Sequence, residues 1–393
     1  MKKKTLLVLV VALVASTMIF ASGDKEKKSG SVSSYKIGFI GPLTGDNANY
    51  GVMSRDAAII AIDEVNAAGG INGTPVEFIA EDSEGTVEKG LSAIEKLAES
   101  DKIISLVGPV FTGPTFAVGD RCQNQGIPLI TGSATHADIT NIGDMIFRTV
   151  VSDGLQGEVA GHYFYEVLGY RNLAVLYAKN DYSQGLYKSM STAFESLGGK
   201  IVDAETCMIG DKDFKTQLTK IKQLKPDAIY IPDYTVEMAQ ILEQAANLEV
   251  GAPFLSCDGF SNPVIFDLAG EYTDGVVYIA PAQVLKSEAY DKFVAKYQAA
   301  YGISPDSFAT NVYDATKIEI EALKRCVAKG TVTRAAMRDE IAATKNYVGV
   351  GGLINFAENG DLIAYQGVYK VKGITPEYLG AFKVVDGKIQ QVK

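Results

Sequence analysis

The sequence contains two copies of one local pattern, and this repeat constrains the fold more than any other feature. The first copy begins at Lys36 and the second at Asn172, with the sequences KIGFIGPLTGDNANYG and NLAVLYAKNDYSQG. Each reads as an apolar strand, a polar turn and a Tyr near the start of a helix. The copies are about 130 residues apart, far beyond the period of solenoid or propeller repeats. The repeat predicts two similar α/β lobes, and clefts between lobes are where small ligands tend to bind.

Short apolar, β-branched runs alternate with longer helical runs along most of the chain, which predicts parallel sheets with right-handed crossovers. The expected strands are 36–40, 76–80, 103–107, 128–131, 174–177, 201–206, 228–231, 253–256 and 276–280. The expected helices are 54–67, 87–100, 115–125, 155–168, 186–197, 214–224, 236–247, 287–301 and 307–329.

The N-terminus has the pattern of a secretory signal. Lys2, Lys3 and Lys4 precede an apolar run that ends in small residues at 21–23. We expect residues 1–23 to be a signal peptide and the Ser- and Lys-rich residues 24–34 to be a flexible leader, with an uncleaved membrane anchor as the alternative. No Cys precedes Cys122, so we expect an exported, periplasmic or extracytoplasmic protein without a lipid anchor.

Charge and composition exclude several classes of function. The formal net charge is −10 and no basic stripe is interleaved with aromatic residues, so we expect no nucleic-acid partner. His136 and His162 are not at metal-ligand spacing, and the Cys residues form no C-x-x-C pair, so we expect no metal and no cofactor. Export permits disulfides, but the four Cys residues are scattered, and we favour buried free thiols: Cys122, Cys207, Cys257 and Cys326.

Two segments of the first lobe follow buried strands, where ligands collect at the carboxyl ends of a parallel sheet. In residues 108–115 we expect Thr112 or Gly113 to cap a helix and Pro114 to begin it, so that backbone N–H groups and the Thr112 hydroxyl could bind a carboxylate. Residues 131–138 (TGSATHAD) offer two further hydroxyls. Capping alone would also explain the first segment. The candidates in the second segment are Ser133, Ala134 and Thr135.

Further candidates come from the repeat and from the second lobe. Tyr50 and Tyr182 occupy equivalent places in the two copies, where they would face one another across a cleft. Tyr234 and Asp258 each follow a predicted strand, and a carboxylate there could pair with an ammonium group. The alternatives are packing at the helix starts for the two repeat tyrosines and an Asx turn for Asp258.

Together these candidates suit a zwitterion. One lobe offers donors for a carboxylate, and the other offers an anion for an ammonium group. Aromatic residues could line an apolar space between them, which predicts a free amino acid with an apolar side chain as the ligand. These aromatic candidates are Tyr50, Phe111, Tyr182, Tyr234 and Phe260.

The motifs resemble those of the leucine/isoleucine/valine-type solute-binding proteins of ABC importers. The similar segments extend from Tyr35 almost to the C-terminus: IGPLTGDNANYG, NAAGGINGTPVE, TGSAT, NDYSQG, YTVEMAQILEQA and FLSCDGFSNP. The resemblance implies a type I periplasmic-binding fold, with two Rossmann-like lobes joined by three crossover hinge strands. We expect residues 35–149 and 281–362 in lobe 1, residues 150–280 and 363–393 in lobe 2, and hinges near 148–151, 280–283 and 361–365.

The resemblance also implies roles for the candidate residues. Thr112, Ser133 and Thr135 would hold the ligand carboxylate, while Asp258, helped by Tyr182, would hold the ammonium. Tyr50 and Tyr234 would border the pocket.

The chain departs from the best-known members at three positions. They often have Glu where this chain has Asp258, which is one methylene shorter. They also have a disulfide between the positions of Glu84 and Phe111, neither of which is Cys here. We therefore expect Phe111 to narrow the side-chain pocket, and leucine itself is not a secure assignment.

The implied function is capture of an amino acid by hinge closure and delivery to an ABC permease of the inner membrane by a monomeric protein. Neither a G-x-G-x-x-G after the first strand nor a G-x-S-x-G motif is present, so we expect no enzymatic activity. A sensory receptor domain is one alternative. A binder of amides, urea or aromatic acids is another, because the family includes such proteins.

Overall fold

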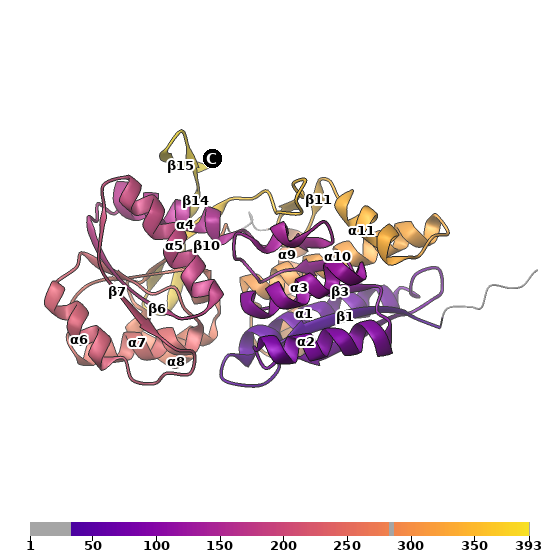
Figure 1. Ribbon diagram of the computed structural model, residues 1–393, viewed down its shortest axis with the longest axis horizontal. Coiled ribbons are helices and arrows are strands. Elements are labelled where there is room, and N and C mark those ends of the chain that lie inside the picture. Colours follow the sequence, from indigo (N-terminus) through magenta and orange to yellow (C-terminus); the bar gives the residue numbers. More distant parts are fainter. Residues whose placement is uncertain (1–32, 283–286, 393) are drawn as a thin grey trace, which may run out of the picture. The chain divides into compact units, whose positions relative to one another are not determined.

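The computed structural model describes residues 33–282 and 287–392. The expected signal peptide, most of the expected leader, and Gln283 at the end of the second expected hinge lie outside these residues. Each of the two copies of the sequence repeat begins the parallel part of one sheet, and helices pack against both sheets (Figure 1).

The first sheet has five strands in the order β2-β1-β3-β4-β5, all parallel. Its strands are β1 (Tyr35–Gly41), β2 (Val76–Asp82), β3 (Ser105–Val107), β4 (Leu129–Thr131) and β5 (Ile146–Arg148). Its helices are α1 (Ala48–Ala67), α2 (Val87–Glu95), the π-helical turn η1 (Lys96–Asp101), α3 (Thr112–Gln125), η2 (Ile139–Ile142), α9 (Glu288–Tyr301), α10 (Ser307–Ala328) and α11 (Arg334–Ala342).

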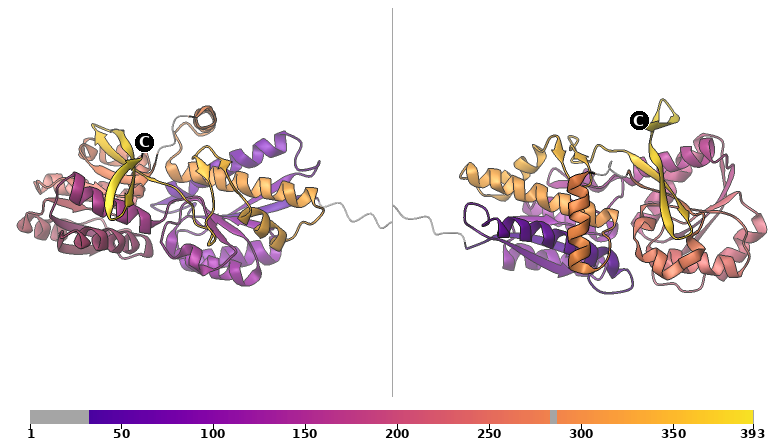
Figure 2. Two further views of the ribbon diagram at one scale, coloured as in Figure 1. Left: turned by 90° about the horizontal axis from the view of Figure 1, so that it is seen from above. Right: turned by 180° about the vertical axis from the view of Figure 1, so that it is seen from behind.

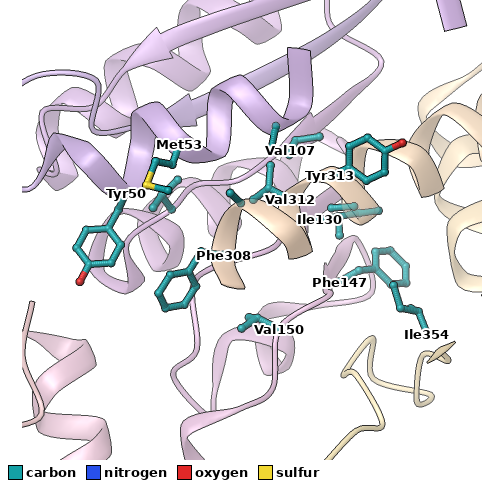
Figure 3. Packing of buried hydrophobic residues seen from close by; sticks show 14 of the residues in the cluster. Tyr50, Met53, Val107, Ile130, Phe147, Val150, Phe308, Val312, Tyr313 and Ile354 are labelled. Carbon is teal, nitrogen blue, oxygen red and sulfur yellow. The ribbon is translucent and has the colours of Figure 1, made fainter. Parts of the chain in front are cut away.

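Helices cover both faces of this sheet, because successive side chains of β1 point to opposite faces and are apolar on both. Ile37 and Phe39 belong to the core formed with α1 and α10, whereas Ile40 belongs to the core formed with α2 and α3. In Figure 3, residues of α1 and α10 pack over the strands, and Tyr50 and Phe308 lie toward the same end of the labelled cluster. The start of α1 and the start of α10 therefore reach the same end of the core.

The second sheet has eight strands in the order β15-β14-β13-β10-β9-β8-β6-β7. Its strands are β6 (Asn172–Ala178), β7 (Lys200–Cys207), β8 (Ala228–Tyr230), β9 (Phe254–Ser256), β10 (Val277–Pro281), β13 (Gln366–Lys372), β14 (Thr375–Val385) and β15 (Lys388–Val392). Its helices are α4 (Asp153–His162), η3 (Tyr163–Val167), α5 (Asp181–Ser196), α6 (Lys215–Leu224), α7 (Thr235–Asn247), η4 (Asp258–Ser261), α8 (Val264–Ala269) and η5 (Gly270–Thr273).

This sheet is mixed, which differs from the expected all-parallel arrangement. Strands β6 to β10 are parallel, but β13 joins β10 antiparallel, and β14 and β15 continue as antiparallel hairpins. Figure 2 shows this C-terminal part in yellow beside the second sheet. No strands were expected here from the sequence. The small pair β11 (Tyr347–Val348) and β12 (Leu353–Ile354) was also not predicted.

The chain passes between the two sheets three times. It leaves β5 for α4, which contacts β10, β13 and β14; it leaves β10 for α9, which contacts α1; and it returns to β13 after the bridge between Phe356 and Leu362. The expected two-sheet α/β fold with three crossovers is confirmed.

Two further expectations concern cysteine and membrane spans. Cys122, Cys207, Cys257 and Cys326 are buried free thiols, as favoured from the sequence. Within residues 33–282 and 287–392, no helix combines the length and apolar character needed to cross a bilayer.

Candidate functional site

Loops from both sheets meet around one small cavity. The ends of β3 and β4 contribute from the first sheet, the ends of β8 and β9 contribute from the second, and the starts of α1, α5 and α10 complete it. The cavity measures about 10 Å³, about the minimum that holds one water molecule. Its lining residues are Tyr50, Val110, Phe111, Thr112, Ser133, Tyr182, Tyr234, Gly259 and Phe308.

Aromatic rings form most of the cavity wall. Tyr234 is stacked between Phe111, with ring centroids 4.5 Å apart, and Tyr182, with centroids 5.1 Å apart. Tyr50 meets Tyr234 and Phe308 edge to face at 5.6 and 5.8 Å. Three of these rings lie at the starts of α1, α5 and α10, and the other two occupy the N-cap positions of α3 and α7. The rings therefore connect loops from both halves of the repeat.

Tyr50 connects elements of the two sheets by hydrogen bonds. Its hydroxyl donates to the carbonyl oxygen of Gly259 at 2.8 Å and lies 2.6 Å from the hydroxyl of Thr235, whose N–H donates to it at 3.2 Å. Burial raises the pKa of Tyr50 well above its ordinary value, although the hydrogen bonds with Thr235 oppose the shift. The phenol is therefore a neutral donor and acceptor.

Asp258 lies at the start of η4 and is buried. Its Oδ1 accepts from the hydroxyl of Tyr182 at 2.5 Å and from the N–H of Gly259 at 3.0 Å, while its Oδ2 has no hydrogen-bond partner. Burial raises the pKa of Asp258 to about 6, although the bond from Tyr182 opposes the shift. A buried carboxylate oxygen without a partner is costly. Asp258 itself does not line the cavity, but Tyr182 and Gly259, which donate to its Oδ1, do.

A second buried carboxyl group accompanies Asp258, and the sequence analysis did not single it out. Asp153 begins α4, is fully buried, and has no hydrogen-bond partner on either carboxyl oxygen. Burial, followed by the negative charge of Asp258, raises the pKa of Asp153 well above its ordinary value, while the nearby hydroxyl of Thr135 and the guanidinium of Arg148 oppose the shift. Gln156, one turn later, accepts from the N–H of Asp258 at 2.9 Å. The only sequence signal for Asp153 is the helix start Ser152-Asp153, where Ser152 caps the helix.

The opposite wall carries hydroxyl groups. Thr112 is the first residue of α3, and Phe111 occupies the N-cap position without a side-chain bond. The expectation that Thr112 or Gly113 caps this helix is therefore wrong, because the helix starts three residues earlier than predicted. The hydroxyls of Thr112 and Thr135 are both buried without hydrogen-bond partners. Thr112 and Ser133 line the cavity, and Thr135 follows Ser133 by two residues.

Two of the candidate residues, Ala134 and Phe260, belong to hydrophobic cores and do not line the cavity. Ala134 is buried against the core of α2 and α3, and its N–H donates to the hydroxyl of Thr131 at 3.0 Å. Phe260 does not line the cavity, contrary to expectation; its ring packs in the core with Phe266 and Tyr278. Phe308, at the start of α10, contributes a wall that the sequence analysis missed.

A larger recess adjoins the cavity. It measures about 580 Å³, and Phe111 and Tyr234 line both spaces. Polar and charged residues make up much of the recess, including Asp46, Lys179 and Asp181. The stacked rings of Phe111 and Tyr234 thus separate a nearly filled inner cavity from an open outer recess.

The sequence and structure match known proteins over most of the chain. A family model described as a periplasmic binding protein matches residues 34–373. The chain belongs to the periplasmic binding protein family. Within it, the similarity is to branched-chain amino acid ABC transporter substrate-binding proteins. The family is one of non-enzymatic binding proteins that act outside the cytoplasm, and this periplasmic binding protein is therefore not an enzyme.

Two curated relatives of this periplasmic binding protein are 31% identical to it. One is the leucine-, isoleucine-, valine-, threonine- and alanine-binding protein of Pseudomonas aeruginosa, with 83% of this chain and 87% of that protein covered. The other is the Leu/Ile/Val-binding protein BraC3 of Rhizobium johnstonii, with 83% and 88% covered.

Solved structures show the same fold. The substrate-binding protein LivJ of Streptococcus pneumoniae, in complex with isoleucine, matches with a TM-score of 0.82 and 29% identity, covering 91% of this chain and all of that one. The leucine-binding protein LivK of Thermotoga maritima matches with a TM-score of 0.81 and 27% identity, covering 88% and 98%. A benzoate complex from Rhodopseudomonas palustris, at 23% identity, shares the fold.

Proposed function

We propose that this protein captures a free α-amino acid with an apolar side chain, of the branched-chain type, for an ABC importer. One observation carries the proposal, which is a set of buried groups without hydrogen-bond partners. The hydroxyl of Thr112 lines the cavity, whereas the hydroxyl of Thr135 and the carboxyl oxygens of Asp153 and Asp258 belong to segments that adjoin its lining. A zwitterion with an apolar side chain suits the hydroxyls, the carboxyl oxygens and the aromatic wall at once.

The ammonium group of the ligand would compensate the buried carboxyl groups. Burying a carboxylate without a partner is unfavourable, and a cation hydrogen-bonded to it reverses much of that cost. Tyr182 orients Asp258 from the other side, so Oδ2 remains for the ligand. Asp153 adds a second acceptor, which offsets the shorter reach of Asp compared with Glu at position 258.

The carboxylate of the ligand would bind at the hydroxyl wall. The first N–H groups of a helix have no partner within the helix, and α3 begins at Thr112. Together with the hydroxyls of Thr112, Ser133 and Thr135, these N–H groups form a site suited to a carboxylate. Loops of the first sheet therefore supply the anion site, while Asp258 comes from the second.

Ligand entry requires the loops to separate. A cavity of about 10 Å³ does not admit an amino acid, and the bonds from Tyr50 to Thr235 and Gly259 close it. Two further bonds join the same elements: Asn262 Nδ2 donates to Asp306 at 2.8 Å, and Ser261 lies 2.8 Å from Ser307. We propose that residues 35–149 with 281–362, and 150–280 with 363–393, part and close as two lobes about the three crossovers.

The remaining features of the proposal concern the cell. Residues 1–23 would be removed as a signal peptide, and residues 24–34 would be a leader. A monomer would deliver the ligand to the inner-membrane permease. A binder of aromatic acids is a weaker alternative, because an acid without an ammonium group leaves Asp153 and Asp258 uncompensated.

The test is direct identification of the ligand. The exported protein would be denatured, released small molecules would be identified by mass spectrometry, and the refolded protein would be titrated with the twenty amino acids by calorimetry. We expect valine, leucine or isoleucine to bind, and their deaminated 2-oxo acids to bind at least about 30-fold more weakly, as loss of a charge pair predicts. Equal affinity for an amino acid and its 2-oxo acid would overturn the proposal.

A further inference from the structure

Arg148 is a buried cation that the binding site, as described above, does not use. It ends β5, has a relative exposure of 0%, and is the largest fully buried side chain of the described residues. A buried guanidinium is costly unless it is paired and hydrogen-bonded, so its partners show what it is held for.

The guanidinium joins two segments that are distant in sequence. Its Nε donates to Oδ1 of Asp361, which lies just before the third crossover. Its Nη1 donates to two successive carbonyl oxygens, those of Thr135 at 3.0 Å and His136 at 2.7 Å. The backbone N–H of Arg148 also donates to the carbonyl oxygen of Gly360 at 3.1 Å.

The two carbonyls belong to the loop that carries candidate ligand groups. Thr135 has an unpartnered, fully buried hydroxyl. Its carbonyl oxygen accepts from Arg148 and, at 2.7 Å, from the N–H of Asp153 at the start of α4. The orientation of the Thr135 peptide group is thus set by one donor from the end of β5 and one donor from the other side of the first crossover.

We propose that Arg148 is a positioning residue for ligand binding: it fixes the loop of Thr135 and His136 to the crossover segment at Asp361. This inference rests on the proposed function, because the loop matters only if Thr135 binds the ligand. A loop held by this fork presents the hydroxyl of Thr135 in one orientation, so the entropy of ordering it is not lost on binding. Closure at the crossovers and the geometry of the carboxylate site are then linked through one side chain.

Asp361 accepts from Nε, whereas Nη1 donates to the two loop carbonyls and the buried Nη2 has no hydrogen-bond partner. Here the planar fork of the guanidinium makes bonds in two directions at once, which a Lys ammonium on a flexible stem reproduces poorly. Arg338 offers a matched comparison in the same half of the molecule. It pairs with Asp144 at 2.6 Å, but the bond is exposed and no loop carbonyl is involved.

The variants for the test are Arg148→Lys, Arg148→Met and Asp361→Asn, with Arg338→Met as the control. Arg148→Lys keeps the charge, so it remains informative if Arg148→Met fails to fold. Affinity for valine, leucine and isoleucine would be measured by calorimetry. Hydrogen exchange of the ligand-free protein would be followed by mass spectrometry for residues 132–138, with residues 172–178 of β6 as the internal reference.

We expect Arg148→Lys to weaken amino-acid binding by about tenfold or more, as loss of positioning of a binding group predicts, and to raise exchange in residues 132–138 relative to β6. Asp361→Asn, which leaves the bonds to both carbonyls, should have the smaller effect on exchange. Arg338→Met should change neither. Unchanged relative exchange of residues 132–138 in Arg148→Lys would overturn the inference, even if the melting temperature falls. If the wild-type protein binds no amino acid, the proposed function fails, and the exchange measurement still decides whether Arg148 positions the loop.

Discussion

The hydroxyl of Tyr50 donates to the carbonyl oxygen of Gly259 at 2.8 Å. Tyr50 lies on α1, which packs on the first sheet, and Gly259 lies on η4, which follows β9 of the second sheet. The two residues are 209 positions apart in sequence, and the bond is buried. Since the same hydroxyl also meets Thr235, one phenol connects α1 to the beginnings of two elements of the second sheet. The closed arrangement around the cavity depends strongly on this contact.

Tyr50→Phe should therefore favour the open arrangement. The change keeps the ring contacts with Tyr234 and Phe308 but leaves the carbonyl of Gly259 and the Thr235 groups without their partner. We expect amino-acid affinity to fall by about 1–3 kcal/mol, as for a buried group left unsatisfied. Calorimetry measures the affinity, and small-angle scattering measures the compactness of the ligand-free protein.

Tyr301→Phe is the matched control, because its hydroxyl donates at 3.3 Å to the carbonyl of Asp56, on the same half of the molecule. This variant should bind like the wild type. If Tyr50→Phe also binds with wild-type affinity and keeps the wild-type radius, the contact between Tyr50 and Gly259 does not stabilise closure.

The two buried carboxyl groups predict a pH dependence of ligand affinity. The pKa of Asp258 is raised to about 6 in the free protein, chiefly by burial. A bound ammonium favours the ionised form and lowers this pKa, so binding below about pH 6 must release a proton. We expect affinity to fall with decreasing pH from about 6 downward, by up to about tenfold per pH unit. Calorimetry at pH 5 in buffers of different ionisation enthalpy would detect the released proton.

Asp258→Asn should remove this part of the pH dependence and weaken binding at pH 7.5 by about 2–5 kcal/mol, as expected when one member of a buried charge pair is lost. Asp267→Asn, on α8, is the control, because Asp267 is exposed and does not line the cavity. The folding stability of the free protein has the opposite pH dependence to the ligand affinity. Because the carboxyl pKa is higher in the folded than in the unfolded protein, the free energy of unfolding decreases as the pH rises from about 4 to about 6. An observed heat that is independent of buffer at pH 5 would contradict the proton release.

Gly259 is a position where a side chain would disturb the site. A Cβ atom there would lie 2.5 Å from the carbonyl oxygen of Asp233 and 3.0 Å from the hydroxyl of Tyr182. Because the first contact is with backbone, η4 must shift, and with it the acceptor for Tyr50. We expect Gly259→Ala to weaken binding by about 1–3 kcal/mol, in line with overpacking at a well-packed site.

Gly275→Ala provides the contrast, although its positive φ of 81° adds strain, because a Cβ there meets nothing within 4 Å. It should reduce thermal stability without changing affinity, as the melting temperature and calorimetry would show. Wild-type affinity in Gly259→Ala would mean that the position of η4 does not control the site.

The sequence predicted the central strands and most of the residues that line the cavity, because both depend on local patterns. Apolar runs bounded by turns located β1 and β6, and residues that follow such strands, including Thr112 and Asp258, had to lie at the carboxyl edges of the sheets. The C-terminal strands β13–β15 were not predicted, because the alternation of strands and helices ends there and pairing partners lie far away in sequence.

The errors within the site have similar causes. Asp153 lies close to Asp258 because the first crossover brings the start of α4 to the second sheet. A local sequence pattern does not contain this information. Phe260 follows Asp258 by two residues, and in the 3₁₀ turn η4 such residues point in different directions. The carboxyl group therefore bonds to Tyr182 while the ring enters the core. Phe308 begins a helix that returns from the distant part of the chain to pack beside α1.

Phe111 is expected to determine which side chains the protein accepts. Its ring stacks on Tyr234 and lies between the cavity of about 10 Å³ and the recess of about 580 Å³. Phe111→Ala should join these spaces and favour larger ligands. We expect the affinity for phenylalanine relative to valine to rise by about 1–3 kcal/mol, the range for changes in a hydrophobic pocket. Competition calorimetry with valine, leucine and phenylalanine measures the ratio.

Phe116→Ala controls for the loss of an aromatic ring in the same helix. Phe116 is half-buried against His136 and does not line the cavity. That variant should lose stability but keep the wild-type ratio of affinities. If Phe111→Ala leaves the ratio of phenylalanine to valine unchanged while still binding an amino acid, then the side chain of the ligand does not lie at Phe111. The choice among apolar amino acids would then rest on Tyr50, Tyr234 and Phe308.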